Sequence, residues 1–256
     1  MNTKTILITG ATSGIGEAAA FQFAQNGHRL IITGRRKERL EALTQKIKEN
    51  YGVPTLSLNF DVRDRQAIIN AIQQLPAEWQ QIDVLVNNAG LALGKDSFDK
   101  ASIDDWDTMI DTNLKGLAYI SHAVVQRMIQ QGSGHIINIS STAGKNVYAE
   151  GNMYCATKHA VTALSESMRI DLLPHRIKVT AIHPGAVDTE FSTVRFKGDK
   201  DAANAVYKGL EPLVAKDVAD TIYYVTTLPA HVCINELVVT CTQQANSFYT
   251  FRNNDH

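Results

Sequence analysis

The feature that most constrains the fold is a glycine-rich segment directly after a short apolar run. The run Thr5–Ile8 leads into Thr9–Gly16, which reads Thr-Gly-Ala-Thr-Ser-Gly-Ile-Gly. Glycine adopts backbone conformations that other residues rarely adopt, and it lets the chain pass close to a bound group. A helix that starts at such a turn presents free N–H groups and the positive end of its dipole to phosphates. Alone the motif is weak evidence, because similar turns also close ordinary strand–helix connections.

Short β-branched runs alternate with longer amphipathic stretches along the whole chain. The predicted strands are Thr5–Ile8, Arg29–Thr33, Thr55–Phe60, Val84–Asn87, His135–Ser140, Lys178–Ile182 and Glu236–Cys241. The predicted helices are Gly16–Gln25, Lys37–Asn50, Arg65–Gln74, Asp104–Gln131, Met153–Leu173 and Asp217–Thr227. Most of the strands are apolar on both faces, which is typical of a parallel sheet covered on each side. The alternation predicts one α/β domain over residues 1–256, a Rossmann-like doubly wound parallel sheet with helices on both faces.

One segment interrupts this alternation. The stretch Asp188–Pro212 is polar, carries Gly198 and Gly209, and follows Pro184-Gly185. An insertion of this kind near a ligand crevice is a candidate lid, and we call residues 188–212 the lid. The tail Gln243–His256 is rich in Asn and aromatic residues, and it either packs across a subunit interface or frays.

Composition excludes several classes of protein. Hydrophobic residues make up 44% of the chain and charged residues 20%, and the net charge of −1 gives no general attraction to nucleic acid or to an anionic membrane. Three cysteines without metal-ligand spacing are expected to be free thiols in a reducing compartment, with no metal site. No apolar run approaches the roughly 20 residues that span a bilayer, and the first strand leaves no room for a signal peptide. We therefore expect a soluble cytoplasmic protein.

The end of the second predicted strand bears on which dinucleotide binds. An NAD-binding fold usually places an acidic residue there to bind the ribose hydroxyls. This chain instead has Gly34-Arg35-Arg36, and a guanidinium suits an anionic 2′-phosphate. The sequence therefore favours NADP over NAD, with Arg35 the preferred contact. The alternative is that both arginines are solvated residues at a helix start. Asp61-Val62 is expected near the adenine, and Asn87–Gly90 beside the cofactor unless its role is purely structural.

A tyrosine and a lysine lie one helical turn apart in a later predicted helix. Tyr154 and Lys158 share one helix face, with Cβ atoms about 5–6 Å apart. A tyrosine has an ordinary pKa of about 10, and a nearby ammonium stabilises its phenolate. The pair can therefore exchange a proton with an alcohol or a carbonyl. Ser141, at the end of a predicted strand, can hydrogen-bond the same substrate oxygen. Taken singly, such a pair is common on exposed helices and such a serine often only caps a strand.

In their order and spacing these motifs resemble the classical short-chain dehydrogenases/reductases. The matching residues are Thr9–Gly16, Asp61, Asn87–Gly90, Asn113, Ser141, Tyr154, Lys158 and Pro184-Gly185. The resemblance covers nearly the whole chain. It implies an oxidoreductase acting on CH–OH groups, with Tyr154 as general acid/base and Ser141 polarising the substrate oxygen. It also implies that Lys158 holds the nicotinamide ribose and lowers the pKa of the tyrosine, and that Asn113 holds a water that connects Lys158 to solvent.

The resemblance completes the expected sites. Thr189 would bind the nicotinamide carboxamide. The catalytic set is Asn113, Ser141, Tyr154 and Lys158. The cofactor-binding set is Gly10, Thr12, Ser13, Gly14, Ile15, Gly16, Arg35, Arg36, Asp61, Val62, Asn88, Ala89, Gly90, Tyr154, Lys158, Pro184, Gly185, Val187 and Thr189. The family is usually tetrameric or dimeric, often through the helices that hold Asn113 and Tyr154, and we expect a homotetramer.

A narrower resemblance lies in the last third of the chain. Asp188–Asp199 and Leu228–His231 are similar to NADP-dependent 3-hydroxy acid dehydrogenases, which act on serine, allo-threonine and malonic semialdehyde. The expected substrate-binding set is Ser141, Tyr154 and Arg195, because a carboxylate needs a cation; a surface arginine that pairs within the lid is the alternative, and Lys197 is a weaker candidate. Two other functions stay open. One is a reductase for bulkier ketones or sugars, and the other is a non-catalytic dinucleotide-binding sensor.

Overall fold

The computed structural model describes residues 3–253 and is built around one parallel sheet. Its strands are β1 (Thr5–Ile8), β2 (Arg29–Gly34), β3 (Thr55–Asn59), β4 (Val84–Asn87), β5 (Gly134–Ile139), β6 (Ile177–Pro184) and β9 (Glu236–Val239). They lie side by side in the order β3-β2-β1-β4-β5-β6-β9, and every neighbouring pair is parallel. The chain order reverses between β1 and β4, which is where a doubly wound sheet forms its ligand crevice.

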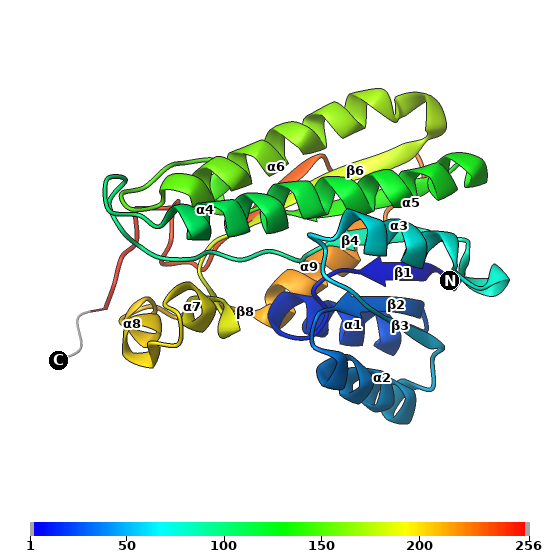
Figure 1. Cartoon of the computed structure of the whole chain (residues 1–256), viewed down its shortest axis with the longest axis horizontal. Helices are drawn as coiled ribbons and strands as arrows, with labels where there is room; N and C mark the ends of the chain where they lie inside the picture. Colours follow the sequence, from blue (N-terminus) through cyan, green and yellow to red (C-terminus); the bar gives the residue numbers. More distant parts are fainter. Residues whose placement is uncertain (1–2, 254–256) are drawn as a thin grey trace.

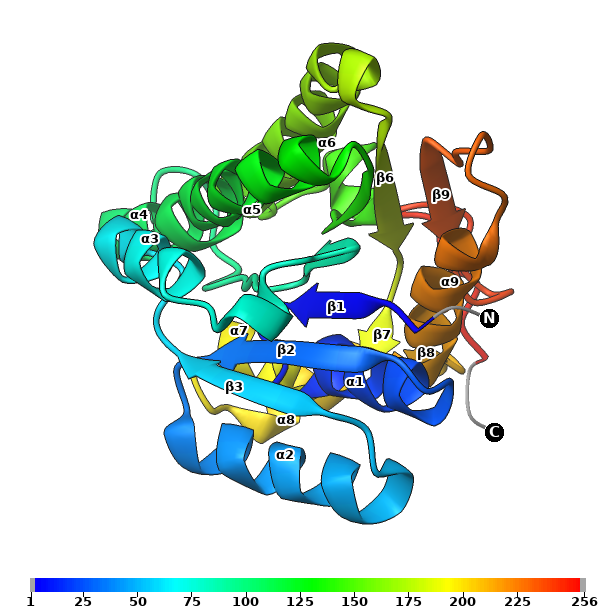
Figure 2. The ribbon, with the colours of Figure 1, turned by 90° about the vertical axis from the view of Figure 1, so that its right-hand side faces the viewer.

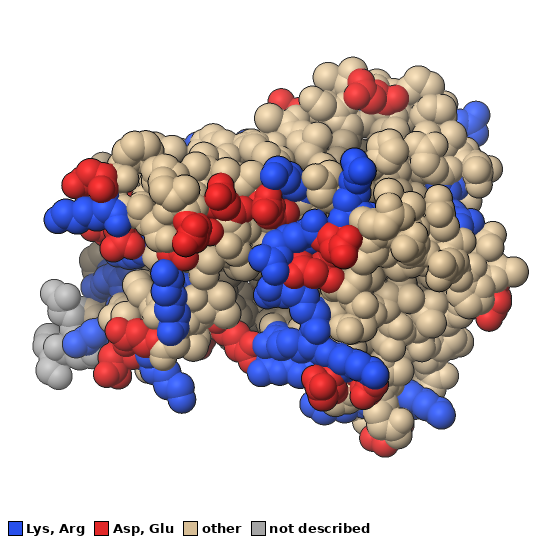
Figure 3. Space-filling view, in the orientation of Figure 1, with Lys and Arg blue, Asp and Glu red and all other residues tan. Residues whose placement is uncertain are grey.

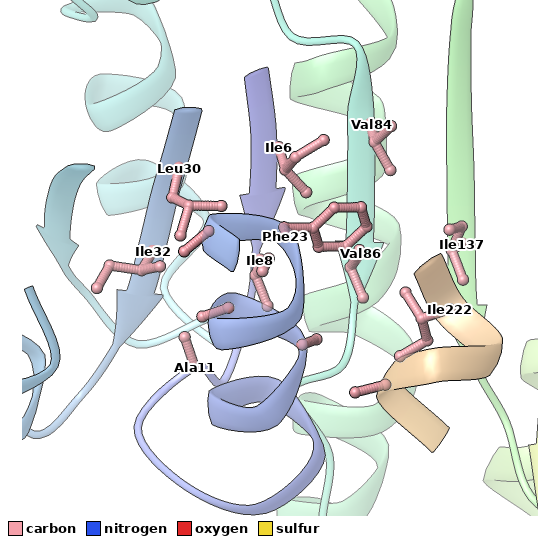
Figure 4. Packing of buried hydrophobic residues seen from close by; sticks show 14 of the residues in the cluster. Ile6, Ile8, Ala11, Phe23, Leu30, Ile32, Val84, Val86, Ile137 and Ile222 are labelled. Atoms are coloured by element: carbon pink, nitrogen blue, oxygen red, sulfur yellow. The ribbon is translucent and has the colours of Figure 1, made fainter. Parts of the chain in front are cut away.

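Alternate residues of the strands pack against helices on opposite faces of the sheet. In β1, Ile6 and Ile8 are in one core cluster and Leu7 is in the other. The first cluster lies under α1 (Gly14–Gln25), α2 (Lys37–Tyr51) and α9 (Ala215–Thr227). Figure 4 shows Phe23 of α1 and Ile222 of α9 above the β strands. This two-sided burial is why the strands read as continuous apolar runs in the sequence.

The opposite face is covered by α3 (Arg65–Gln73), α5 (Leu117–Gln131) and α6 (Asn152–Asp171), with α4 (Ile103–Ile110) beside them. Figure 2 shows these helices on one side of the strands and α1 and α2 on the other. The observed order of strands and the helices on both faces of the sheet confirm the predicted fold class, a Rossmann-like doubly wound parallel sheet. Short 3-10 turns connect the elements at Ala77–Trp79, Thr142–Gly144 and Leu173–His175.

The predicted helix Asp104–Gln131 contains a change of hydrogen-bond pattern. Between α4 and α5 the segment Asp111–Gly116 is a π-helical turn. The backbone of this turn passes close to the segment after β3, since a Cβ on Gly116 would lie 2.8 Å from Cγ2 of Val62. The extra residue per turn widens the helix where Asn113 points inward.

The lid extends from the sheet as a separate layer. It follows β7 (Val187–Asp188), contains α7 (Glu190–Arg195) and α8 (Lys200–Ala205), and ends at β8 (Leu213–Val214). The pairing of β7 with β8 closes the base of the insertion. Figure 1 shows α7 and α8 apart from the sheet, beneath α4 and the start of α6.

The described part of the tail packs on the lid. Gln243 accepts a hydrogen bond from the Glu211 backbone N–H, and the Arg252 guanidinium donates to the backbone oxygens of Val206 and Lys208. The last residues of the predicted tail, 254–256, lie outside the described residues. Among the described helices, none combines the length and the apolar composition needed to cross a bilayer.

Candidate active site

A cavity of about 960 Å³ lies at the carboxyl ends of the strands. Its walls come from the glycine turn after β1, the segments that follow β2 to β6, and α7 of the lid. Residues of the predicted sites that line it are Gly10, Thr12, Ser13, Gly14, Ile15, Arg35, Arg36, Asp61, Val62, Asn88, Ala89, Gly90, Ser141, Tyr154, Lys158, Pro184, Gly185, Val187, Thr189 and Arg195. Gly16 and Asn113 are the predicted site residues that do not line it.

The backbone of the glycine turn passes very close to the neighbouring segment after β4. Gly10 and Gly14 have φ of 65° and 55°, and a Cβ on Gly10 would lie 2.9 Å from Cα of Ala89. Gly16 lies behind the turn, where a Cβ would come within 2.4 Å of the Gly10 carbonyl oxygen. Gly16 is therefore needed for packing rather than for contact with a ligand. Ser13 precedes α1 without capping it through its side chain, so the first N–H groups of the helix are left for another acceptor.

The two arginines after β2 take different positions. Arg36 donates to the hydroxyl of Ser13 at 2.8 Å and to the hydroxyl of Thr12 at 2.9 and 3.2 Å, which places its guanidinium against the glycine turn. Arg35 is more exposed and lies 3.7 Å from the Asp61 carboxylate. Burial alone would raise the pKa of Asp61, but hydrogen bonds from Arg63 bring it below its usual value. The structure thus sets Arg36 against the glycine turn and Arg35 beside Asp61, while Arg35 as the preferred phosphate contact stays a prediction of the sequence.

Two further residues at this edge carry no sequence signal that we recognised. Arg39 of α2 donates to the Glu190 carboxylate at 2.8 and 3.0 Å, and Arg36 donates to the same carboxylate at 3.0 Å. Hydrogen bonds from Arg39 and then Arg36 lower the pKa of Glu190 below its usual value. The partners are far apart in sequence, so only the fold brings them together. Figure 3 shows Lys and Arg side chains gathered beside a hollow in this face.

Tyr154 and Lys158 project from α6 into the cavity, and both are nearly buried. The Lys158 ammonium donates to the backbone oxygen of Ile139 at 2.9 Å and lies 5.8 Å from the centre of the Tyr154 ring. Burial lowers the pKa of Lys158 to about 8. Ser141 lies at the end of β5, where its hydroxyl accepts from the Ala143 backbone N–H. The three side chains that the sequence proposed as a proton-transfer group do line one cavity.

The pKa of Tyr154 moves opposite to the sequence-based expectation. Burial raises the pKa of Tyr154 above its ordinary value of 10, and the neighbouring Tyr148 adds to the rise. A hydrogen bond with Ser141 and the charge of Arg195 oppose this rise without cancelling it. Helical spacing predicted the proximity of the ammonium but could not predict how completely α7 and the loop around residue 148 cover the phenol. By itself, the chain therefore holds Tyr154 as a protonated phenol at neutral pH.

Asn113 lies inside the π-helical turn, just behind the cavity wall. Its Oδ1 accepts from the Leu91 backbone N–H at 2.8 Å, and its Nδ2 donates to the Leu91 carbonyl at 2.8 Å and to the Thr157 hydroxyl at 3.1 Å. A Cβ on Gly90 would lie 3.3 Å from Asn113 Oδ1 and 3.4 Å from Lys158 Nζ. The amide thus anchors the segment after β4, and both it and the Lys158 ammonium lie beside Gly90.

Arg195 brings a cation from the lid to the tyrosine. It donates from Nη1 to the Tyr148 hydroxyl at 2.9 Å and from Nε to the Gly94 carbonyl at 3.1 Å. Its guanidinium carbon lies 5.8 Å from the Tyr154 ring centre, and Phe191 of the same helix packs against that ring. Among the described residues, Nη2 of Arg195 makes no hydrogen bond. Tyr148 is a site residue that sequence reasoning missed, because it is one tyrosine in a loop whose partner is in the lid.

Known proteins are similar to this chain in sequence and in fold. The family model for short chain dehydrogenase matches residues 4–200. The chain is 51% identical over 233 residues to the NADP-dependent 3-hydroxy acid dehydrogenase YdfG of Escherichia coli (strain K12), covering 91% of this chain and 92% of that one. It is 45% identical over 245 residues to sulfoacetaldehyde reductase 2 of Chromohalobacter salexigens, covering 95% of this chain and 96% of the relative.

A solved structure described as the closed form of serine dehydrogenase complexed with NADP+ superposes with a TM-score of 0.91. The two sequences are 47% identical, and the match covers 98% of this chain and all of that one. The chain therefore belongs to the short-chain dehydrogenase family. The family that the motifs predicted is confirmed, and so is its oxidoreductase class.

Proposed function

We propose that this chain is an NADP-dependent oxidoreductase that transfers a hydride between the nicotinamide and a small 3-hydroxy acid of the serine, allo-threonine or 3-hydroxypropionate type. The observation that carries the proposal is the position of Arg195. A lid cation with an unused donor lies beside Tyr154, and the cavity that holds both also contains the glycine turn. The match to the 3-hydroxy acid and serine dehydrogenases supports the same substrate class.

The described residues fit a dinucleotide phosphorylated on its 2′-hydroxyl. The close approach at Gly10 and the uncapped start of α1 suit a pyrophosphate, and Arg36 with Arg39 suits the extra phosphate. There is no carboxylate at the end of β2, where an NAD site usually has one. Asp61, Val62, Asn88–Gly90, Pro184–Val187 and Thr189 also line the cavity.

Bound NADP supplies the hydride acceptor or donor of the reaction. Tyr154 transfers the proton to or from the substrate oxygen, and Ser141 binds that oxygen. Lys158 would hold the nicotinamide ribose, and Asn113 positions the segment after β4, whose Gly90 lies beside the lysine. A Tyr154→Phe variant should lose turnover but still bind NADP+, because phenylalanine keeps the ring and removes only the hydroxyl that transfers the proton. Substantial turnover in this variant would contradict the role of the tyrosine.

Arg195 is our proposed anchor for the substrate's acidic group. A guanidinium binds a carboxylate through two parallel hydrogen bonds, and Nη2 is available for one of them. Burial around Tyr148 and Phe191 strengthens such a contact compared with one in open water. A sulfonate, as in sulfoacetaldehyde, is the second anion that the same group could bind. Such a guanidinium would favour a small anion over a bulky neutral ketone.

The first test measures NADP-linked absorbance with purified protein on L-serine, L-allo-threonine, 3-hydroxypropionate and a neutral secondary alcohol, with NAD as control. Turnover of the hydroxy acids with NADP supports the proposal. Turnover of the neutral alcohol alone would still support hydride transfer but would refute the assignment to hydroxy acids. Reduction of sulfoacetaldehyde in preference to malonic semialdehyde would move the substrate class from carboxylates to sulfonates.

A variant pair tests the anion anchor. Arg195→Ala should raise KM for a hydroxy acid on the order of 10- to 100-fold, because it removes a charged hydrogen-bond donor, and should change KM for a neutral alcohol far less. Lys200→Ala is the matched control, because Lys200 is an exposed lid cation that does not line the cavity. Equal effects of Arg195→Ala on both substrates would refute the assignment.

We also propose a cytoplasmic homotetramer with one domain over residues 1–256. Exposed Ile103 of α4, Ile170 of α6 and Leu173 just after it give apolar surface on the helices that would meet a second subunit. Light scattering coupled to gel filtration measures the mass directly. A monomer at micromolar concentration would exclude this assembly.

A further inference from the structure

The lid is tied to α2 by one carboxylate. Glu190 is the first residue of α7, and its two oxygens accept from Arg36 at 3.0 Å and from Arg39 at 2.8 and 3.0 Å. We call this group of three side chains the Glu190 bridge. All three are close to half exposed, so the bridge lies at the rim of the cavity, where a ligand can reach it.

Arg36 has no other anionic partner within residues 3–253. Its remaining bonds go to Thr12 and Ser13 of the glycine turn, which fix the guanidinium in the wall of the cavity. Arg39 has Glu190 as its acceptor and nothing else in the described chain. Two guanidinium groups held in this way, facing one carboxylate, form a site for an anion with several oxygens.

We propose that Glu190 controls the affinity for the 2′-phosphate by occupying, from the lid, the arginines that bind it. This inference rests on the proposed use of NADP. A phosphate needs the same guanidinium donors as the Glu190 carboxylate, and two anions that share these donors would repel each other. The phosphate would therefore bind the arginines only by displacing Glu190. NAD has no such phosphate and leaves the bridge in place. Glu190 is thus a specificity-determining residue outside the predicted cofactor set.

The two ends of α7 are held by different contacts, and the end that carries Arg195 lies where the substrate is proposed to bind. The helix runs from Glu190 to Arg195, and beyond it Lys197 pairs with Asp105 while Arg195 exchanges two hydrogen bonds with Gly94. These contacts hold the substrate end of the lid to the segment after β4 and to α4. The nucleotide end is held by the Glu190 bridge. Displacement of Glu190 therefore removes the contact between α7 and α2 and leaves the contacts of Arg195 in place.

The direction of the change in affinity distinguishes competition from its alternative. If the carboxylate served to orient Arg36 and Arg39 for the phosphate, removing its charge would weaken NADP binding. If the carboxylate competes, removing its charge strengthens NADP binding. Glu190→Gln keeps the size of the side chain and separates the two cases by the direction of the change. An exposed residue at a helix start tolerates this substitution well.

The experiment is calorimetric titration of the purified, nucleotide-free protein and variants with NADP+, NAD+, adenosine 2′,5′-bisphosphate and AMP. We expect Glu190→Gln to bind the two 2′-phosphorylated ligands about five- to ten-fold more tightly, with NAD+ and AMP within about two-fold of wild type. Glu190→Asp keeps the charge and should show a smaller gain. Glu41→Gln is the control, because Glu41 is an exposed acid of α2 paired with Lys37.

Unchanged or weaker binding of adenosine 2′,5′-bisphosphate by Glu190→Gln would overturn the proposal. A gain of the same size in Glu41→Gln would also overturn it, since the effect would then be one of net charge. The wild-type titrations test the proposed cofactor separately. A wild type that binds NAD+ as tightly as NADP+ removes the proposed cofactor preference, whereas a clear preference for NADP+ with no effect of Glu190→Gln removes only this inference.

Discussion

Replacing Lys158 by Met should stabilise the protein while removing its activity. Lys158 is nearly buried in α6, and burial lowers its pKa from 10.5 to about 8. A buried ammonium that is still charged at neutral pH costs folding free energy, because the unfolded chain solvates it better. Met has a similar shape, no charge and high helix propensity. Lys158 thus lowers the stability of the fold at a position where we expect its charge to be needed for activity.

The magnitude follows from the two pKa values. One pKa unit corresponds to about 1.4 kcal/mol, so a fall from 10.5 to about 8 corresponds to about 3 kcal/mol at pH 7. The variant also loses the hydrogen bond to the Ile139 carbonyl, which costs about 1 kcal/mol. We therefore expect Lys158→Met to be about 2 kcal/mol more stable at pH 7.

The pH dependence has a defined sign. Between the folded pKa near 8 and the unfolded value of 10.5, the unfolded wild type binds more protons than the folded one, so its stability rises with pH. The Met variant has no such group. The advantage of the variant should therefore shrink by about 2 kcal/mol between pH 7 and about pH 9.5.

The assay is urea unfolding of nucleotide-free protein at the two pH values, followed by the fluorescence of Trp79 and Trp106. Lys46→Met, on the exposed face of α2, controls for the general effect of removing a lysine. An advantage of Lys158→Met that stays constant with pH would refute the electrostatic reasoning. So would a variant that is less stable than wild type at pH 7.

Three further outcomes follow from contacts in the cavity wall. Gly10→Ala should destabilise the fold by about 2–4 kcal/mol in urea unfolding, because a Cβ would clash with the segment after β4 and φ is positive. Asn113→Ala should cost about 3 kcal/mol in the same assay, since both backbone polar groups of Leu91 lose their partner. Arg36→Ala should raise the Kd for NADP+ on the order of 10- to 100-fold, more than Arg35→Ala does, with NAD+ as the control ligand.

Much of the fold could be read from periodicity. The predicted strands match the observed ones closely because strands buried on both faces are continuous apolar runs, as β1 shows. The π-helical turn Asp111–Gly116 could not be read in this way. Its cause is tertiary: the amide of Asn113 bonds the backbone of Leu91, and Gly116 passes against Val62. Neither contact leaves a pattern within the helix.

The site shows the same division between local and tertiary signals. The turn around Gly10 and the Tyr154–Lys158 spacing are local, and the fold places them where the motifs predicted. The sequence favoured Arg35 as the contact to the 2′-phosphate, and it could not show that Arg36 is the side chain that meets Thr12 and Ser13 across the crevice. Arg39, Glu190 and Tyr148 were missed because each gains its role from a residue of another segment.

The electrostatics of the tyrosine connect the lid to the direction of proton transfer. Arg195 is the cationic side chain that lowers the pKa of Tyr154, against the larger rise caused by burial. A substrate anion bound to that guanidinium neutralises its charge, so the phenol holds its proton more firmly while the anion is present. At neutral pH the phenol is protonated with or without the anion, so it can donate a proton to a carbonyl oxygen in either case. The higher pKa makes proton removal from an alcohol depend more on other positive charge near the ring, so the same lid residue that would select an acidic substrate also sets how much of that charge the oxidation direction needs.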